Sequence, residues 1–82
     1  MKHIYINDLV YYSYEGMNCV DYIVSIVKVW VKDDGDAYMK EVKSCQAKFN
    51  DSLLHLSGGD VVRLCDVDRI VTRHFKKREV LF

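Results

Sequence analysis

The segment from Val20 to Lys32 (VDYIVSIVKVWVK) constrains the fold more than any other part of the chain. Its β-branched residues disfavour a helix, because they lose side-chain freedom against the preceding turn and pack well on a pleated sheet. Apolar side chains change parity halfway, from Val20, Tyr22, Val24 and Ile26 to Val27, Val29 and Val31. Since strand side chains alternate with a period of two, a bulge or bend is predicted near Ile26–Val27. A long strand bent in its middle can serve two sheets and close a very small barrel.

The residues before this segment predict a turn and a strand. Asn7-Asp8 is typical of a turn, and residues 9–14 (LVYYSY) follow as a strand. In that strand Val10, Tyr12 and Tyr14 share one face, and Leu9 and Tyr11 share the other. Residues 15–18 form the next loop, in which Gly16 can take a positive φ.

Asp34-Gly35 is the strongest hairpin signal in the chain, because a type I′ turn needs positive φ at both central residues. A turn centred on this pair predicts the cross-strand partners Val31–Tyr38, Trp30–Met39, Lys28–Glu41 and Val27–Val42. A shift by one residue would place Lys28 opposite Lys40, which like-charge repulsion disfavours.

The second half of the chain predicts two further strands and little helix. A short helical turn is expected over residues 52–56, capped by Asn50 or Asp51. Strands are expected over 61–65 and 70–75, joined by a tight polar turn at 66–69, and residues 76–82 are spaced like a short C-terminal helix. The expected fold is an all-β, small five-stranded barrel in which the second strand is long and bent.

The length of the chain predicts one small domain, and its charges are distributed unevenly along the sequence. The 82 residues are expected to form a single domain over 1–82. Residues 1–68 carry seven basic and eleven acidic side chains, a net of −4, whereas residues 69–82 carry five and one, a net of +4. The chain is therefore an acidic body with a short basic end.

The order of parts resembles SH3-like barrels of the Tudor type, and in particular small uncharacterised bacterial and phage proteins of that shape. The resemblance lies in residues 7–12, the long bent strand, the Asp34-Gly35 hairpin, and the short turn at 65–70. It covers about four-fifths of the chain and is one of pattern. It implies a module that binds nucleic acid or a protein segment, and fold alone does not choose between them.

Aromatic residues supply the first candidate site. The chain has six Tyr, three Phe and one Trp, more than its core needs, and Tyr11 and Trp30 fall on the outward parity. Exposed rings can anchor a partner protein or stack on bases. The alternative is that Trp30 packs on Met39 and the tyrosines bury their rings with the hydroxyls in water. The expected protein-binding residues are Tyr11, Trp30, Tyr38 and Met39.

The basic end supplies a second candidate site, for phosphates of a nucleic acid. It comprises Arg69, Arg73, His74, Lys76, Lys77 and Arg78. Binding through such a cluster would weaken steeply with salt. The acidic body would repel a duplex, and a solvated polar end is the commoner meaning of such a run.

Metal binding and catalysis find no support in the sequence. Cys19, Cys45 and Cys65 have no close spacing of the kind zinc sites use, and Asp33–Asp36 is too short for a calcium loop. No nucleophile elbow or phosphate-binding glycine loop is present. We therefore expect no enzyme, no cofactor and no metal.

The expected function is that of a non-catalytic protein-binding module, acting as an accessory, adaptor or inhibitor protein, and the expected origin is a phage or other mobile element. A nucleic-acid-binding barrel is the alternative, and pairing of two copies through a β edge is a variant. The absence of a signal sequence, of a membrane-spanning run and of a disulfide pattern favours a cytoplasmic protein.

Overall fold

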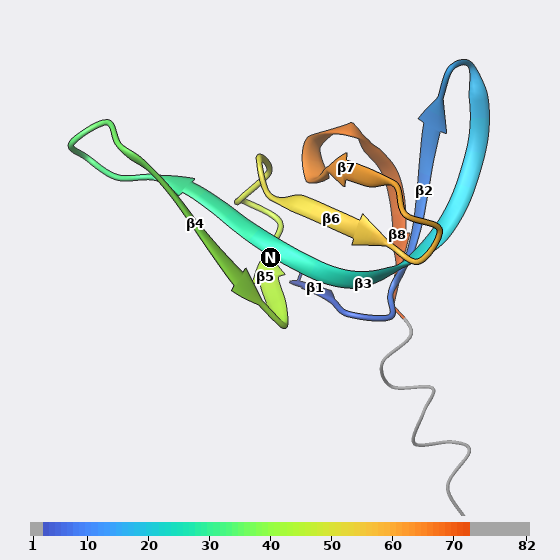
Figure 1. The fold of residues 1–82 in the computed structure, drawn as a ribbon, viewed down its shortest axis with the longest axis horizontal. Coiled ribbons are helices and arrows are strands. Elements are labelled where there is room, and N and C mark those ends of the chain that lie inside the picture. The colour runs from blue at the N-terminus through green and yellow to red at the C-terminus, as the bar shows by residue number, and fades with distance from the viewer. Residues whose placement is uncertain (1–2, 73–82) are drawn as a thin grey trace, which may run out of the picture.

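The computed structural model describes residues 3–72, and their fold is all-β, with antiparallel strands throughout. The strands are β1 (His3–Tyr5), β2 (Leu9–Tyr14), β3 (Met17–Val31), β4 (Ala37–Val42), β5 (Ser44–Gln46), β6 (Leu53–Leu56), β7 (Val61–Arg63) and β8 (Val67–Val71). One sheet has the order β7-β6-β3-β2-β8, with β4 also paired to β3, and β1 pairs with β5 (Figure 1). The path from β7 to β8 does not close on itself within the described residues. The all-β prediction is confirmed, with more and shorter strands than the five expected.

Strand β3 pairs with three other strands, and its pairings with β2 and β4 are the two longest among the described residues. It pairs with β2 through its first part, with β6 around its middle and with β4 through its last part (Figure 1). The predicted irregularity is present but lies earlier than expected, because the register against β6 shifts between Ile23 and Ser25. Ile23 and Ile26, three residues apart, are both fully buried. The extra residue at Val24 therefore moves the inward parity from odd to even positions.

The β3–β4 hairpin has the register that the sequence argument rejected. Lys28 lies opposite Lys40, and Trp30 lies opposite Tyr38. The predicted type I′ turn is wrong: the Gly35 N–H donates to the Lys32 carbonyl at 2.9 Å, and only Gly35 in this loop has a positive φ, of 87°. This is a three-residue loop, a type I turn followed by a left-handed glycine.

The predicted helical turn at residues 52–56 is wrong, because β6 occupies this segment. Leu54 and Leu56 are buried while Leu53 and His55 are only half-buried, an alternation with the period of a strand. Ser52, just before β6, is fully buried, and its Oγ accepts a hydrogen bond from the Val29 N–H at 3.0 Å. Pairing with β3 thus outweighs the local cap and glycine signals.

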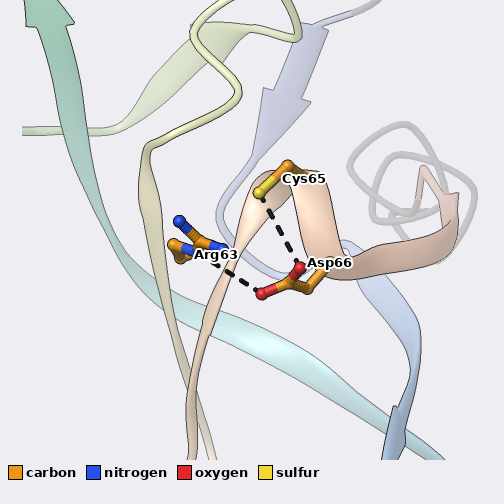
Figure 2. Close-up of polar contacts among 3 residues, drawn as sticks. All are labelled: Arg63, Cys65 and Asp66. Atoms are coloured by element: carbon orange, nitrogen blue, oxygen red, sulfur yellow. Dashed lines mark hydrogen bonds and ion pairs between the residues drawn. The ribbon is translucent and has the colours of Figure 1, made fainter.

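A single 3₁₀ turn, η1 (Leu64–Asp66), replaces the polar turn expected at 66–69. Figure 2 shows its exposed side, where Arg63 Nε lies 3.4 Å from Asp66 Oδ2 and the Cys65 thiol contacts the same carboxylate. Strand β8 then begins at Val67 rather than at residue 70, because Val67 already pairs with Tyr12 of the antiparallel strand β2. The predicted C-terminal helix over 76–82 lies outside the described residues.

The core collects inward side chains from most strands. Its buried residues are Ile4, Val10, Tyr12, Ile23, Ile26, Cys45, Leu54, Leu56 and Leu64. The predicted inward parity of β2 is confirmed at Val10 and Tyr12, whereas Tyr14 at the strand end is exposed. Buried Asp8 accepts the Tyr5 N–H through Oδ2 at 3.0 Å, which fixes the predicted turn at Asn7-Asp8.

Candidate binding face on the hairpin

The tip of the β3–β4 hairpin extends away from the other strands (Figure 1). The hairpin carries a pair of stacked rings, Trp30 and Tyr38. Trp30 and Tyr38 lie directly opposite each other in the two strands, so their side chains share one face. Their ring centroids are 5.9 Å apart with an interplanar angle of 26°. Both side chains are half-buried. A broad aromatic surface is thus fixed in place while part of it meets solvent.

Lysines surround these rings. Lys28 Nζ lies 4.9 Å from the Trp30 ring centroid and 4.1 Å from that of Phe49. Lys32 Nζ lies 4.1 Å from the Tyr38 centroid, and Lys48 Nζ lies 5.2 Å from the Phe49 centroid. Such distances are those of cation–π contacts. We call this surface the Lys–aromatic face: Lys28, Trp30, Lys32, Tyr38, Lys40, Lys48 and Phe49.

No lysine of this face forms an ion pair with a carboxylate of residues 3–72. The one ion pair within those residues that has an N–O distance of 4.0 Å or less joins Arg63 to Asp66, far along the chain from the hairpin. At the hairpin tip the Tyr38 hydroxyl donates a 3.5 Å hydrogen bond to Asp34. The face therefore keeps its positive charge available to a ligand. These lysines were not predicted as a site, because they are dispersed along the sequence and do not form a basic run like that at the C-terminal end.

Met39 does not belong with Trp30 and Tyr38, contrary to the sequence prediction. In the observed register it lies opposite Val29, on the other face of the hairpin. Met39 and Val31 on that face are exposed at 63% and 61%. Consecutive strand residues point to opposite faces, so Tyr38 and Met39 cannot share one. The longer hairpin loop decides which of the two lies beside Trp30, and in the observed register it is Tyr38.

Tyr11 lies in β2, on the other side of the molecule from β4 (Figure 1). Its partner in β8 is Arg69, whose guanidinium carbon is 4.4 Å from the Tyr11 ring centroid. One residue from each predicted site therefore meets here, and neither touches the Lys–aromatic face. The remaining basic candidates, Arg73, His74, Lys76, Lys77 and Arg78, lie outside the described residues.

The outer face of β3 carries an apolar strip that was not predicted from the sequence. Val20, Tyr22 and Val24 are exposed at 53%, 40% and 45%. They have the same parity as Ile26, but the bulge between Ile23 and Ser25 leaves them exposed while Ile26 is buried. Ile23, the apolar residue that interrupts their alternation, is the signal of this bulge in the sequence.

Elsewhere among the described residues, a polar contact joins Tyr12 to Asp60. Tyr12 donates its hydroxyl to Asp60 at 2.9 Å, and burial, reinforced by this carboxylate, raises the pKa of Tyr12 to about 12. A phenol held neutral in this way is a poor base or nucleophile. Among residues 3–72 no group of three or more His, Cys, Asp or Glu side chains could hold a metal ion. The three cysteines are free, and Cys45 is buried.

Comparisons with known proteins give no relative: no family model matches the chain, and no curated protein or solved structure matches it significantly. No helix within the described residues is long and apolar enough to cross a membrane. Function is therefore inferred from the geometry of the faces described above.

Proposed function

We propose that this protein is a non-catalytic binding module that acts as a small accessory, adaptor or inhibitor protein by holding another protein on its Lys–aromatic face. The observation that carries the proposal is the Trp30–Tyr38 stack, flanked by lysines that have no carboxylate partner among residues 3–72. Trp and Tyr are the residues that most often dominate binding energy at protein interfaces.

The charge of the face specifies the partner further. Lysines at the rim of an aromatic anchor attract an acidic surface and speed its association. We therefore expect a partner that presents acidic side chains around an apolar residue able to lie on the Trp30 and Tyr38 rings. Lys28 and Lys40, directly opposite each other, would then each find an anionic group.

Paired variants of the hairpin test this proposal. Trp30→Ala with Tyr38→Ala should abolish capture of a specific partner by the immobilised protein. Met39→Ala with Val31→Ala is the control on the opposite face, where both side chains are more exposed than the two rings, and it should retain capture. The reverse result would move the site to the Met39 face and overturn the proposal. Captured protein should also dissociate more readily at high salt.

Single-stranded nucleic acid is the second candidate ligand, and the same cation–aromatic geometry favours it. Bases can stack on exposed rings while lysines contact phosphates. Fluorescence anisotropy of a labelled single strand and of a duplex, titrated with salt, tests this alternative. Binding that weakens steeply with salt, together with quenching of the single tryptophan, would support it. No binding at low salt would exclude it, because electrostatic attraction is strongest there.

A Lys76→Glu, Lys77→Glu variant separates the two basic regions. If nucleic acid binds at the basic end, this variant should lose binding while Trp30→Ala only weakens it. If it binds on the Lys–aromatic face, the order should reverse. Equal tolerance of both changes would contradict both sites.

We further infer that the strands close as a small SH3-like barrel of the Tudor type. Support comes from the bent β3, shared by β2 and β6, and from the short turn of η1 between the last two strands. Amide hydrogen exchange on the outer edges of β7 and β8 tests the closure. Slow exchange on both edges would support it, and rapid exchange on both would contradict it.

A further inference from the structure

The outer edge of β4 carries backbone groups that point away from β3. The Lys32 N–H donates to the Asp36 carbonyl at 3.1 Å, so these two residues form a hydrogen-bonded pair. Such pairs alternate in an antiparallel ladder. Trp30–Tyr38 and Lys28–Lys40 are therefore hydrogen-bonded pairs as well. Residues 37, 39 and 41 consequently direct their N–H and C=O groups outward.

The edge is long and unpaired in the part of the chain that the structure describes. Strand β4 pairs with β3 alone, over six residues, and the other strands with one free edge are shorter. A row of unpaired N–H and C=O groups is a template for another strand. Met39, in the middle of this row, is 63% exposed. Both backbone and side chain therefore favour an added strand.

We infer that this strand is β4 of a second copy, paired antiparallel with Met39 on the two-fold axis. In this register Met39 faces Met39, Lys40 faces Tyr38 of the second copy, and Ala37 faces Glu41. All three outward residues of each strand then form hydrogen-bonded pairs, as the alternation requires. The inference does not depend on the proposed function.

The charges of β4 favour this register over the alternative in which Lys40 lies on the two-fold axis. A shift that keeps the hydrogen bonding and moves the axis to Lys40 would set two ammonium groups directly opposite each other, which is unfavourable. In the inferred register each Lys40 lies across from a tyrosine ring instead, and a lysine on Tyr38 already has a precedent in Lys32, 4.1 Å from its centroid. Edge lysines commonly prevent association, and this register removes that obstacle.

The pairing would join two hairpins into one continuous sheet. Because Tyr38 and Lys40 lie on the same side of β4 as the rest of the Lys–aromatic face, both copies of that face would lie on one surface. A partner with two acidic segments could then bind both at once, which raises its apparent affinity without new contacts.

Sedimentation velocity over a concentration series tests the association. The wild type should shift from one to two chain masses as concentration rises. Met39→Lys, which places two charges on the axis, should weaken dimerisation at least tenfold. Val31→Lys is the matched control, since Val31 is as exposed on the same face of the hairpin but lies in β3. A wild type that stays monomeric, or a Met39→Lys variant that dimerises equally well, would overturn the inference.

Cysteine cross-linking tests the register. Cα atoms of a hydrogen-bonded antiparallel pair are about 5.5 Å apart, a separation that a disulfide can span. In a Cys65→Ser background, which removes the exposed native thiol, Met39→Cys should give a disulfide-linked dimer on mild oxidation. Lys40→Cys in the same background should not. Cross-linking of Lys40→Cys alone would overturn the register.

A monomeric protein would still be free to bind a partner on its Lys–aromatic face. Failure of dimerisation and failure of the proposed function are therefore separate results.

Discussion

The backbone N–H of Gly58 donates a 2.8 Å hydrogen bond to Asp21 Oδ2, and this contact ties the middle of β3 to the loop between β6 and β7. The same carboxylate accepts hydrogen bonds from the Ser57 hydroxyl and from the Tyr22 N–H. A Cβ atom on Gly58 would lie 2.9 Å from Asp21 Oδ2, closer than real Cβ contacts allow. The absence of a side chain at 58 is what lets the carboxylate reach the loop.

Gly58→Ala should therefore destabilise the fold, by about 1 kcal/mol. Loss of a hydrogen bond to a charged group costs about 1.5–3 kcal/mol, and the reduced freedom of the unfolded chain returns about 0.4–1 kcal/mol. Urea unfolding measures the change. In an Asp21→Ala background the same substitution should be neutral or stabilising, and an equal loss in both backgrounds would contradict the role of Asp21.

The Asp21 contacts also predict a loss of stability in acid. The Ser57 hydrogen bond, helped by the Gly58 and Tyr22 N–H groups and opposed by burial, holds the pKa of Asp21 below its ordinary value of 3.8. A lowered pKa in the folded state gives stability that is present above pH 3.8 and is lost as the pH falls through the folded pKa. The free energy of unfolding of wild type should thus approach that of Asp21→Asn in acid. An offset independent of pH would contradict this.

At the alkaline end Tyr12 should limit stability. Burial, with the hydrogen bond to Asp60, raises the pKa of Tyr12 to about 12. A raised pKa gives stability that is fully present below the unfolded value of 10 and is lost as the pH rises through about 12. Ultraviolet titration of tyrosinate should show one of the six tyrosines ionising late, and Tyr12→Phe should remove that component. Asp60→Asn should lower the pKa of Tyr12.

The sequence predicted well what depends on alternation within a single strand. The inward parity of Val10 and Tyr12 follows from period-two patterning alone, and so does the all-β class. Residues 53–56 show the opposite case. Their local signals favour a helical turn, but pairing with β3 on one side and β7 on the other supplies hydrogen bonds that a single turn cannot.

The candidate site was predicted only in part because register depends on the loop. Adding one residue to the hairpin loop moved Tyr38 opposite Trp30 and sent Met39 to the other face. Repulsion alone disfavours Lys28 opposite Lys40, but Lys28 Nζ lies over the rings of Trp30 and Phe49. Phe49 comes from a loop distant in the sequence, so this contact could not be predicted from the hairpin residues.

The Trp30–Tyr38 stack should contribute measurably to stability as well as to binding. Aromatic pairs of this kind contribute about 0.5–1.5 kcal/mol beyond the area they bury. A double-mutant cycle with Trp30→Leu and Tyr38→Leu should yield a coupling energy in that range by urea unfolding, followed by circular dichroism because Trp30 is the only tryptophan. A coupling near zero would mean that the rings act independently.

The opposed lysines of the hairpin predict that stability and binding conflict at position 40. Lys40→Glu replaces a like-charge pair with Lys28 by an opposite-charge pair, which should stabilise the hairpin by about 0.2–1 kcal/mol. The same change places a negative charge on the Lys–aromatic face, so capture of an acidic partner should fall. Lys40→Gln separates the two effects, since it removes the repulsion without adding attraction. It should give a smaller gain in urea unfolding and a smaller loss of binding. A Lys40→Glu protein that is less stable than wild type would contradict the observed register. A Lys40→Glu protein that is more stable but binds the acidic partner equally well would show that Lys40 lies outside the contact.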